Sequence, residues 1–170
     1  GGGGNFGVVT SFTFRTYAVG ALSLFTLRWP WSSAATVVDA WQHWAPQAPD
    51  EIWSNCLLQA TADKNSDPLI QVNGVYVGDV APLNTLLAQL TNQIGVAPIS
   101  RYVWSDSLLN TMLYEAGCYQ QTVGQCHLPN QDPNGQVQRV TAGAKSDYFA
   151  KLLSGQGVNN LVNAVTRRHN

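Results

Sequence analysis

The chain has 170 residues, 45% of them hydrophobic, which is enough for one domain with a substantial core. Its nine Lys and Arg residues balance ten Asp and Glu, so no basic stripe predicts nucleic-acid binding. No apolar run approaches the roughly 20 residues that cross a bilayer, and no signal peptide is recognisable. We therefore expect neither a nucleic-acid nor a membrane partner. The start at Gly1 rather than Met indicates a processed, cut or excised chain.

Amide side chains are unusually frequent. Asn and Gln contribute thirteen residues each, and so together outnumber the nine basic and ten acidic residues. Solubility then rests on neutral hydrogen-bonding groups, which is common outside the cytoplasm and suits sites for neutral polyols. We expect a secreted or extracytoplasmic protein, with a cytoplasmic location left open.

Alternation of polar and apolar residues predicts the strands. Residues 8–16 and 20–29 form one expected hairpin, and residues 51–62 and 68–78 form a second around the polar turn "DKNSD". Residues 137–145 are expected to form a fifth strand, and "APISRYVW" can supply one more.

Helical periodicity predicts four helices between these strands. The first ends at Pro46, the second runs from Pro82 to Gly95, the third is capped by Asp106, and the last lies near the C-terminal end. Hairpins joined by helices indicate an α+β fold, with an antiparallel β-sheet and α-helices packed on one face. The apolar stripes can all be buried only if every helix lies on the same side of the sheet.

Two of the expected strands have one apolar face and one mixed face. In residues 51–62 the mixed face carries Trp53, Asn55, Leu57 and Gln59, and in residues 137–145 it carries Arg139, Thr141 and Lys145. Such a face is either washed by solvent or covered by a ligand. Trp53 and Leu57 would be wasted on open solvent, and amides beside aromatics are typical of a binding surface.

The three cysteines allow several interpretations. Cys56 lies in an apolar alternating run and is expected to be a buried thiol. Cys118 and Cys126 flank a loop, and we favour a disulfide there over a metal site completed by His127 or two free thiols.

Motifs for known chemistry are otherwise missing from the sequence. The histidines have no metal-ligand spacing, so no metal is predicted, and no nucleophile elbow, Walker loop or paired-carboxylate motif assigns a catalytic residue. The opening glycines are not a dinucleotide fingerprint, because an alternating segment follows them where the fingerprint needs a helix.

Four motifs occur in order along the chain: "GGGGNFGVVTSFTFR", "WQHWAPQAPDEIWSNC", "AGC…QCHLP" and "AKSDYF". Together they resemble the flavin-dependent oxidases of the berberine bridge enzyme-like group, in the vanillyl-alcohol oxidase superfamily. The resemblance implies an FAD domain and a substrate domain whose open sheet covers the flavin. It places residues 1–9 at the end of the FAD-binding domain and residues 10–170 in an incomplete substrate-binding domain.

The resemblance also implies site residues. Backbone groups near FAD are expected at Gly2, Gly3, Gly4, Asn5, Phe6, Gly7 and Val8, where residues without Cβ allow close approach. Substrate contacts are expected at Asn55, Gln59, Arg139, Thr141 and Lys145. Most of the FAD would be bound by a domain missing from this chain. The family's flavin-attachment residues and catalytic tyrosine would also lie outside this chain.

The expected activity is oxidation of an alcohol, sugar or amine by hydride transfer to flavin, with oxygen as acceptor. The complete protein would be the oxidase, and these residues alone would be inactive. The expected partners are a small-molecule substrate and the flavin domain of the same protein, which predicts an exposed apolar patch or self-association. The alternative is a non-enzymatic α+β module that binds carbohydrate or protein.

Overall fold

The computed structural model describes residues 7–16 and 18–169 of the chain. In these residues four strands and four α-helices follow one another, with short 3-10 turns at Trp31–Ser33 and Ala45–Gln47. In chain order the elements are β1 (Leu22–Trp29), α1 (Ala34–Trp44), β2 (Ile52–Gln59), β3 (Leu69–Val77), α2 (Val80–Ile94), β4 (Ser100–Asp106), α3 (Leu108–Glu115) and α4 (Gly155–His169).

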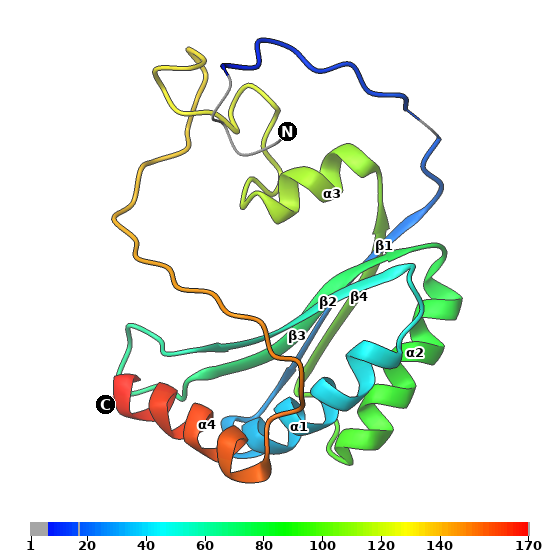
Figure 1. The fold of residues 1–170 in the computed structure, drawn as a ribbon, viewed down its shortest axis with the longest axis vertical. Coiled ribbons are helices and arrows are strands. Elements are labelled where there is room, and N and C mark those ends of the chain that lie inside the picture. Colours follow the sequence, from blue (N-terminus) through cyan, green and yellow to red (C-terminus); the bar gives the residue numbers. More distant parts are fainter. Residues whose placement is uncertain (1–6, 17, 170) are drawn as a thin grey trace.

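The four strands form one antiparallel sheet in the order β2-β3-β1-β4. β1, α1 and β2 form one split β-α-β unit, and β3, α2 and β4 form a second unit interleaved with the first, which is the ferredoxin-like arrangement. In Figure 1, α1, α2 and α4 lie below the sheet and α3 lies above it. The predicted α+β fold is confirmed.

The hydrophobic core lies between the sheet and the helices below it. Phe25, Leu27 and Trp29 project from the central strand β1 toward the apolar stripes of α1 and α2. Each of these three side chains is at most 2% exposed. Val158 of α4 also packs into this core. Burial of these helix stripes against one strand face is the main stabilising contribution in a fold of this kind.

Local signals set the helix ends, with two corrections. Pro82 is predicted as the first residue of the second helix, but α2 begins two residues earlier, at Val80, after the extended residue Asp79. Gly95 ends α2 in the left-handed conformation with φ 72°, as the sequence predicts. Asp106 was expected to cap α3, but the cap is Ser107, whose Oγ accepts a hydrogen bond from the Asn110 backbone N–H. Asp106 instead accepts hydrogen bonds from the Ser107 backbone N–H and from Asn110 Nδ2.

Two predicted strands and one predicted helix position are wrong. Residues 8–16 are described and form no strand, and the side chains of Phe12 and Phe14 are exposed. Residues 137–145 are exposed and irregular, within the long connection that Figure 1 draws from the loop above the sheet to α4. The requirement that all helices share one side fails for α3, whose Thr111 alone is buried. Instead of pairing with residues 8–16, β1 pairs with β3 and β4.

Candidate ligand-binding site

The register brings three rows of side chains together on the open face, meaning the sheet face opposite α1, α2 and α4. Cross-strand partners project from the same face, so one row is apolar and two are mostly polar. From β2 to β4 the rows are Trp53, Val75, Leu24 and Trp104; then Asn55, Asn73, Thr26 and Tyr102; then Leu57, Gln71, Arg28 and Ser100.

A chain of hydrogen bonds joins polar groups on the open face. Arg28 Nε donates to Gln71 Oε1 at 3.1 Å, and Gln71 Nε2 donates to Asn73 Oδ1 at 3.2 Å. The first bond crosses from β1 to β3, the second runs along β3, and together they orient both amides. The guanidinium end of Arg28 stays exposed at the surface of this network.

Three buried oxygens on the same face have no hydrogen-bond partner: Thr26 Oγ1, Asn55 Oδ1 and Ser100 Oγ. A buried polar atom without a partner costs roughly 1–3 kcal/mol, and such atoms in native proteins tend to mark functional sites. The open face therefore holds acceptors that the described residues do not satisfy.

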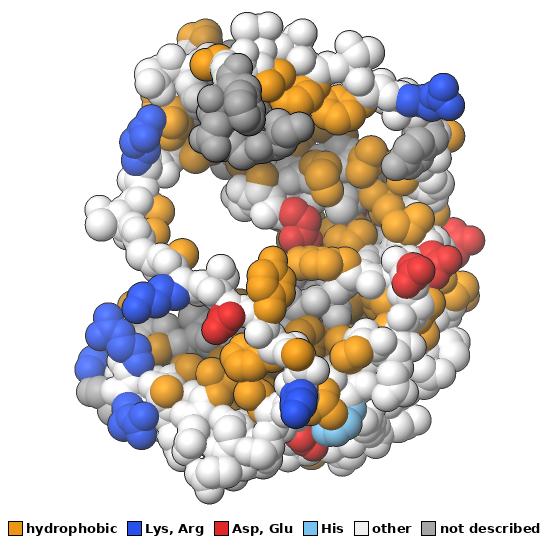
Figure 2. All heavy atoms as spheres, viewed as in Figure 1, with side chains coloured by type: hydrophobic (Ala, Val, Ile, Leu, Met, Phe, Trp, Pro, Cys, Tyr) orange, Lys and Arg blue, Asp and Glu red, His pale blue; other side chains and the backbone are white. Residues whose placement is uncertain are grey.

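A cavity of about 400 Å³ lies on this face near β4. Trp104, Tyr114 and Tyr119 form an aromatic ladder along it, with ring centroids 5.3 Å and then 5.6 Å apart in edge-on contacts. Figure 2 shows the molecule hollowed between the upper part and the sheet, with hydrophobic side chains around the hollow. The cavity is lined by Thr26, Arg28, Tyr102, Val103, Trp104, Tyr114 and Tyr119. Its size suits a small ring compound.

The disulfide between Cys118 and Cys126 is confirmed, with Cα atoms 5.7 Å apart. We call residues 118–126 the disulfide loop; it follows α3 and carries Tyr119 to the cavity. Within the described part of the chain, no cluster of three or more His, Cys, Asp or Glu residues could hold a metal ion.

The structure separates the predicted substrate contacts into two groups. Asn55 and Gln59 lie on the open face of edge strand β2, as expected from the alternation of that segment. Arg139, Thr141 and Lys145 lie in the exposed irregular connection and project from no strand, because the predicted strand there does not form. Their contact with substrate stays a prediction.

The predicted cofactor residues fall at the start of the chain. Gly2, Gly3, Gly4, Asn5 and Phe6 lie outside the described residues. Gly7 and Val8 are described and exposed, and an added Cβ at Gly7 would meet nothing within 4 Å. The described residues thus show no phosphate cradle around Gly7.

Sequence reasoning missed most of the residues around the cavity. Thr26, Arg28, Tyr102 and Trp104 alternate along β1 and β4, and the alternation would have placed them on one face had the strand pairing been known. Tyr114 and Tyr119 come from α3 and the disulfide loop, which cross this face from outside the sheet. No periodic signal in the sequence indicates that approach.

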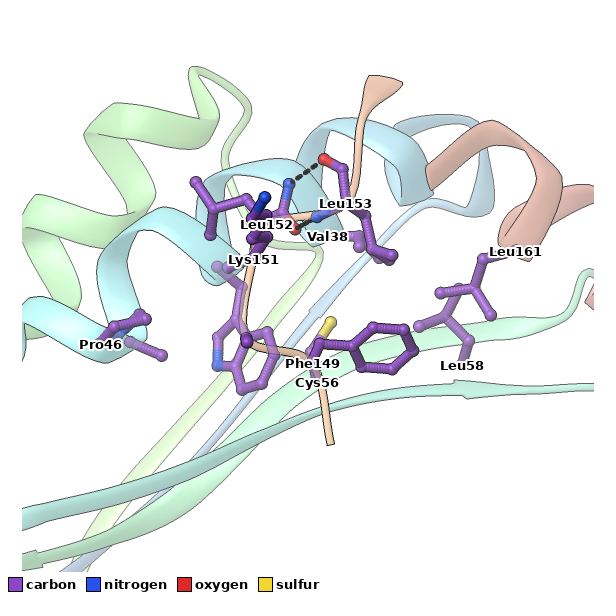
Figure 3. A pocket seen from close by; sticks show the side chains of 13 residues that line it. Val38, Pro46, Cys56, Leu58, Phe149, Lys151, Leu152, Leu153 and Leu161 are labelled. Carbon is purple, nitrogen blue, oxygen red and sulfur yellow. Dashed lines mark hydrogen bonds between the residues drawn. The ribbon is translucent and has the colours of Figure 1, made fainter. Parts of the chain in front are cut away.

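A second cavity, of about 800 Å³, lies on the helix-covered side between α1, β2 and the segment before α4. In Figure 3, Phe149, Cys56, Leu58 and Leu161 surround it, and its lining is otherwise mostly aliphatic. Gln42 holds the segment in place: its Nε2 donates to the Leu153 carbonyl oxygen at 3.1 Å, and its Oε1 accepts from the Leu153 N–H at 2.8 Å. The polar side chains in the lining are Gln42, whose amide is already bonded to Leu153, and Lys151.

Cys56 is expected to be unreactive in the folded protein, because burial raises the pKa of its thiol to about 12. Ellman's reagent at pH 8 should therefore modify almost none of the native thiol. Unfolding without reductant should release one reactive thiol per chain, since Cys118 and Cys126 are bonded. Cys56→Ser is the control and should release none. Three thiols, or rapid reaction of the native protein, would contradict this expectation.

The fold is an α+β domain, with α1, α2 and α4 on one side of its sheet and a polar, aromatic surface on the other. Within the described residues, no helix is long and apolar enough to cross a membrane. No protein-family model matches the chain, and no solved structure matches it.

Two curated proteins of Bacillus subtilis (strain 168) are similar in sequence. The chain is 36% identical over 90 residues to the uncharacterized FAD-linked oxidoreductase YgaK, and 36% identical over 91 residues to the uncharacterized FAD-linked oxidoreductase YvdP. Each alignment covers 53% of this chain, but only 19% of YgaK and 20% of YvdP. The chain thus matches about a fifth of each relative. Their names support the FAD-linked part of the predicted resemblance.

Proposed function

We propose that this chain is the substrate-binding portion of an FAD-dependent oxidoreductase, of the berberine bridge enzyme-like kind. Its activity would be oxidation of an alcohol, sugar or amine, with oxygen as the final acceptor. The observation that carries the proposal is the open face, on which amides, a guanidinium and three unpartnered oxygens lie beside an aromatic row. The similarity to two FAD-linked oxidoreductases supports the cofactor.

The chain's own residues would bind and orient the substrate. The Arg28, Gln71 and Asn73 network offers fixed donors and acceptors for hydroxyl or amino groups. Thr26 and Asn55 would gain the partners that they lack. Such placement brings the reacting carbon to a defined position and supplies catalysis through orientation.

The described residues fit FAD in part. The row of Trp53, Val75, Leu24 and Trp104 offers a flat apolar surface to a planar ring, but no described glycine-rich loop enters a helix to hold a diphosphate. We propose that the rest of the cofactor site lies in a flavin domain outside these residues, joined through residues 1–9. When bound, FAD would accept the hydride that the substrate loses.

We also propose that the protein works in an oxidising compartment. The Cys118 and Cys126 disulfide suits a secreted or extracytoplasmic protein, because thiols in the cytoplasm are mostly kept reduced.

The test uses the complete reading frame that contains this chain. The purified protein should be yellow, with a flavin absorption band at about 450 nm. That band should bleach when an oxidisable alcohol, sugar or amine is added without oxygen. Oxygen should restore it with formation of peroxide. Asn55→Ala should slow the bleaching and leave the flavin bound, whereas Asn159→Ala, on the exposed side of α4, should change neither.

The second candidate is a non-enzymatic carbohydrate-binding module, which the same face favours because aromatic rings and amides recognise sugars. A colourless complete protein that binds sugars and forms no peroxide would support this module and contradict the oxidoreductase.

A further inference from the structure

Tyr119 stands between two cavities above the sheet. On one side is the cavity of about 400 Å³ on the open face, which we call the face cavity. On the other is a cavity of about 220 Å³, which we call the side cavity. Tyr119 lines both, and no other described residue does so. Its side chain is therefore the partition between them.

The position of Tyr119 does not come from burial. The side chain is 55% exposed, and its ring makes an edge-on contact with the Tyr114 ring. An exposed tyrosine of this kind would normally sample several rotamers. Its backbone must therefore be held by the residues on either side.

The preceding residues are fixed by the end of α3. The chain turns through Gly117 at φ 75°, and the Cys118 N–H donates to the Leu113 carbonyl oxygen at 2.7 Å. This is the Schellman hydrogen bond, which closes a helix and sets the direction of the residues after it. Cys118 is 2% exposed, so burial holds its side chain in place in addition to this hydrogen bond.

The following residues are fixed by the disulfide loop. Gln120 has φ 63°, a left-handed conformation that reverses the chain directly after Tyr119. The loop is then closed by the bond from Cys118 to Cys126, and the Cys126 N–H donates to the Thr122 carbonyl oxygen at 3.0 Å. The backbone of Tyr119 is thus constrained on both sides by a helix end and a covalent link.

The side cavity is polar where the face cavity is aromatic. Asp106, Asn110 and Gln121 line it, and the buried Oε1 of Gln121 has no hydrogen-bond partner. A ligand that extends past Tyr119 would therefore meet acceptors and an amide suited to a second polar ring.

We propose that Tyr119 determines the size of ligand that the site accepts, and that the Cys118 and Cys126 disulfide positions it for this role. With the disulfide intact, the Tyr119 ring confines a ligand to the face cavity. Removal of the ring, or release of the loop, joins the two cavities and admits a ligand with a second ring. This inference rests on the proposed function only for the chemical class of ligand.

The test measures binding to the complete protein of two ligand pairs: glucose with maltose, and benzyl alcohol with 4-biphenylmethanol. Tyr119→Ala should raise the affinity for the two-ring member relative to the one-ring member by about tenfold, the scale of discrimination by pocket shape. Tyr119→Phe should keep the native ratio. The double variant Cys118→Ser and Cys126→Ser should behave as Tyr119→Ala does.

Two controls separate this role from general loosening. Tyr148→Ala removes a tyrosine that is 99% exposed and lines neither cavity, and Cys56→Ser removes the thiol on the helix-covered side. Both should keep the native ratio. An unchanged ratio in Tyr119→Ala, with both ligands still bound, would overturn the proposal.

Failure of the proposed function gives a different result. If no member of either pair binds the native protein, the substrate classes are wrong, and crystal structures of the native protein and its variants decide the role of Tyr119. The Tyr119→Ala structure should show one joined cavity, and the double cysteine variant should show a displaced Tyr119 ring. A ring that keeps its native place without the disulfide would overturn the positioning role.

Discussion

Replacement of Phe25 by alanine is expected to lower the free energy of unfolding by about 3–5 kcal/mol, as for other buried Phe side chains. Phe25 is 1% exposed and lies at the centre of the sheet, opposite Gly74 on β3 and Val103 on β4. Its partner Gly74 has no side chain that could move into the space left by the ring. Guanidinium chloride unfolding of the native and variant chains measures the loss.

Phe14→Ala is the matched control, because this ring is 77% exposed. Its loss should stay within about 0.5 kcal/mol, as for other surface positions. If Phe25→Ala does not fold, Phe25→Leu gives a smaller loss that can still be measured. Equal losses at Phe25 and Phe14 would contradict the placement of the core below β1.

The sequence allowed prediction of the elements whose signals are local. The hairpin of β2 and β3 spans a short polar turn, and its alternating residues pair as expected from Ile52 to Gln59. The end of α2 follows its Gly signal, with φ 72° at Gly95. These features depend on neighbours within a few residues, so periodicity and capping chemistry are sufficient.

The pairing of β1 could not be predicted in the same way. Its partners are β3 and β4, which lie far along the chain. The adjacent alternating segment 8–16 forms no strand and does not pair with β1. Alternation shows that a segment can present two faces, but it does not identify the strand with which the segment pairs. Residues 137–145 also alternate and form no strand.

The candidate site shows the same limit. Asn55 and Gln59 were placed correctly on the mixed face because a single strand defines that face. The rows that connect Asn55 to Thr26 and Tyr102 depend on the register of three further strands. The position of Tyr119 depends on the disulfide and on α3; both could be predicted, but no sequence signal shows that α3 lies on the open face of the sheet.

Gly74→Ala is expected to destabilise the fold by more than about 3 kcal/mol, beyond the usual cost of overpacking. A Cβ at this position would lie 2.0 Å from the Trp53 carbonyl oxygen and 2.9 Å from the Phe25 ring. The Trp53 oxygen belongs to the backbone of the neighbouring strand, so β2 and β3 would have to separate. Loss of soluble protein or a large fall in the melting temperature would report this change.

Two further variants identify which contact is responsible. Gly20→Ala is the matched control: an added Cβ there meets nothing within 4 Å, and the smaller entropy of the unfolded chain should leave stability unchanged or slightly higher. In the double variant Gly74→Ala and Phe25→Leu the clash with the ring is relieved, but the clash with the Trp53 oxygen remains. The double variant should therefore stay strongly destabilised. Recovery of native stability would show that the Phe25 ring, and not the spacing of β2 and β3, is what requires glycine at residue 74.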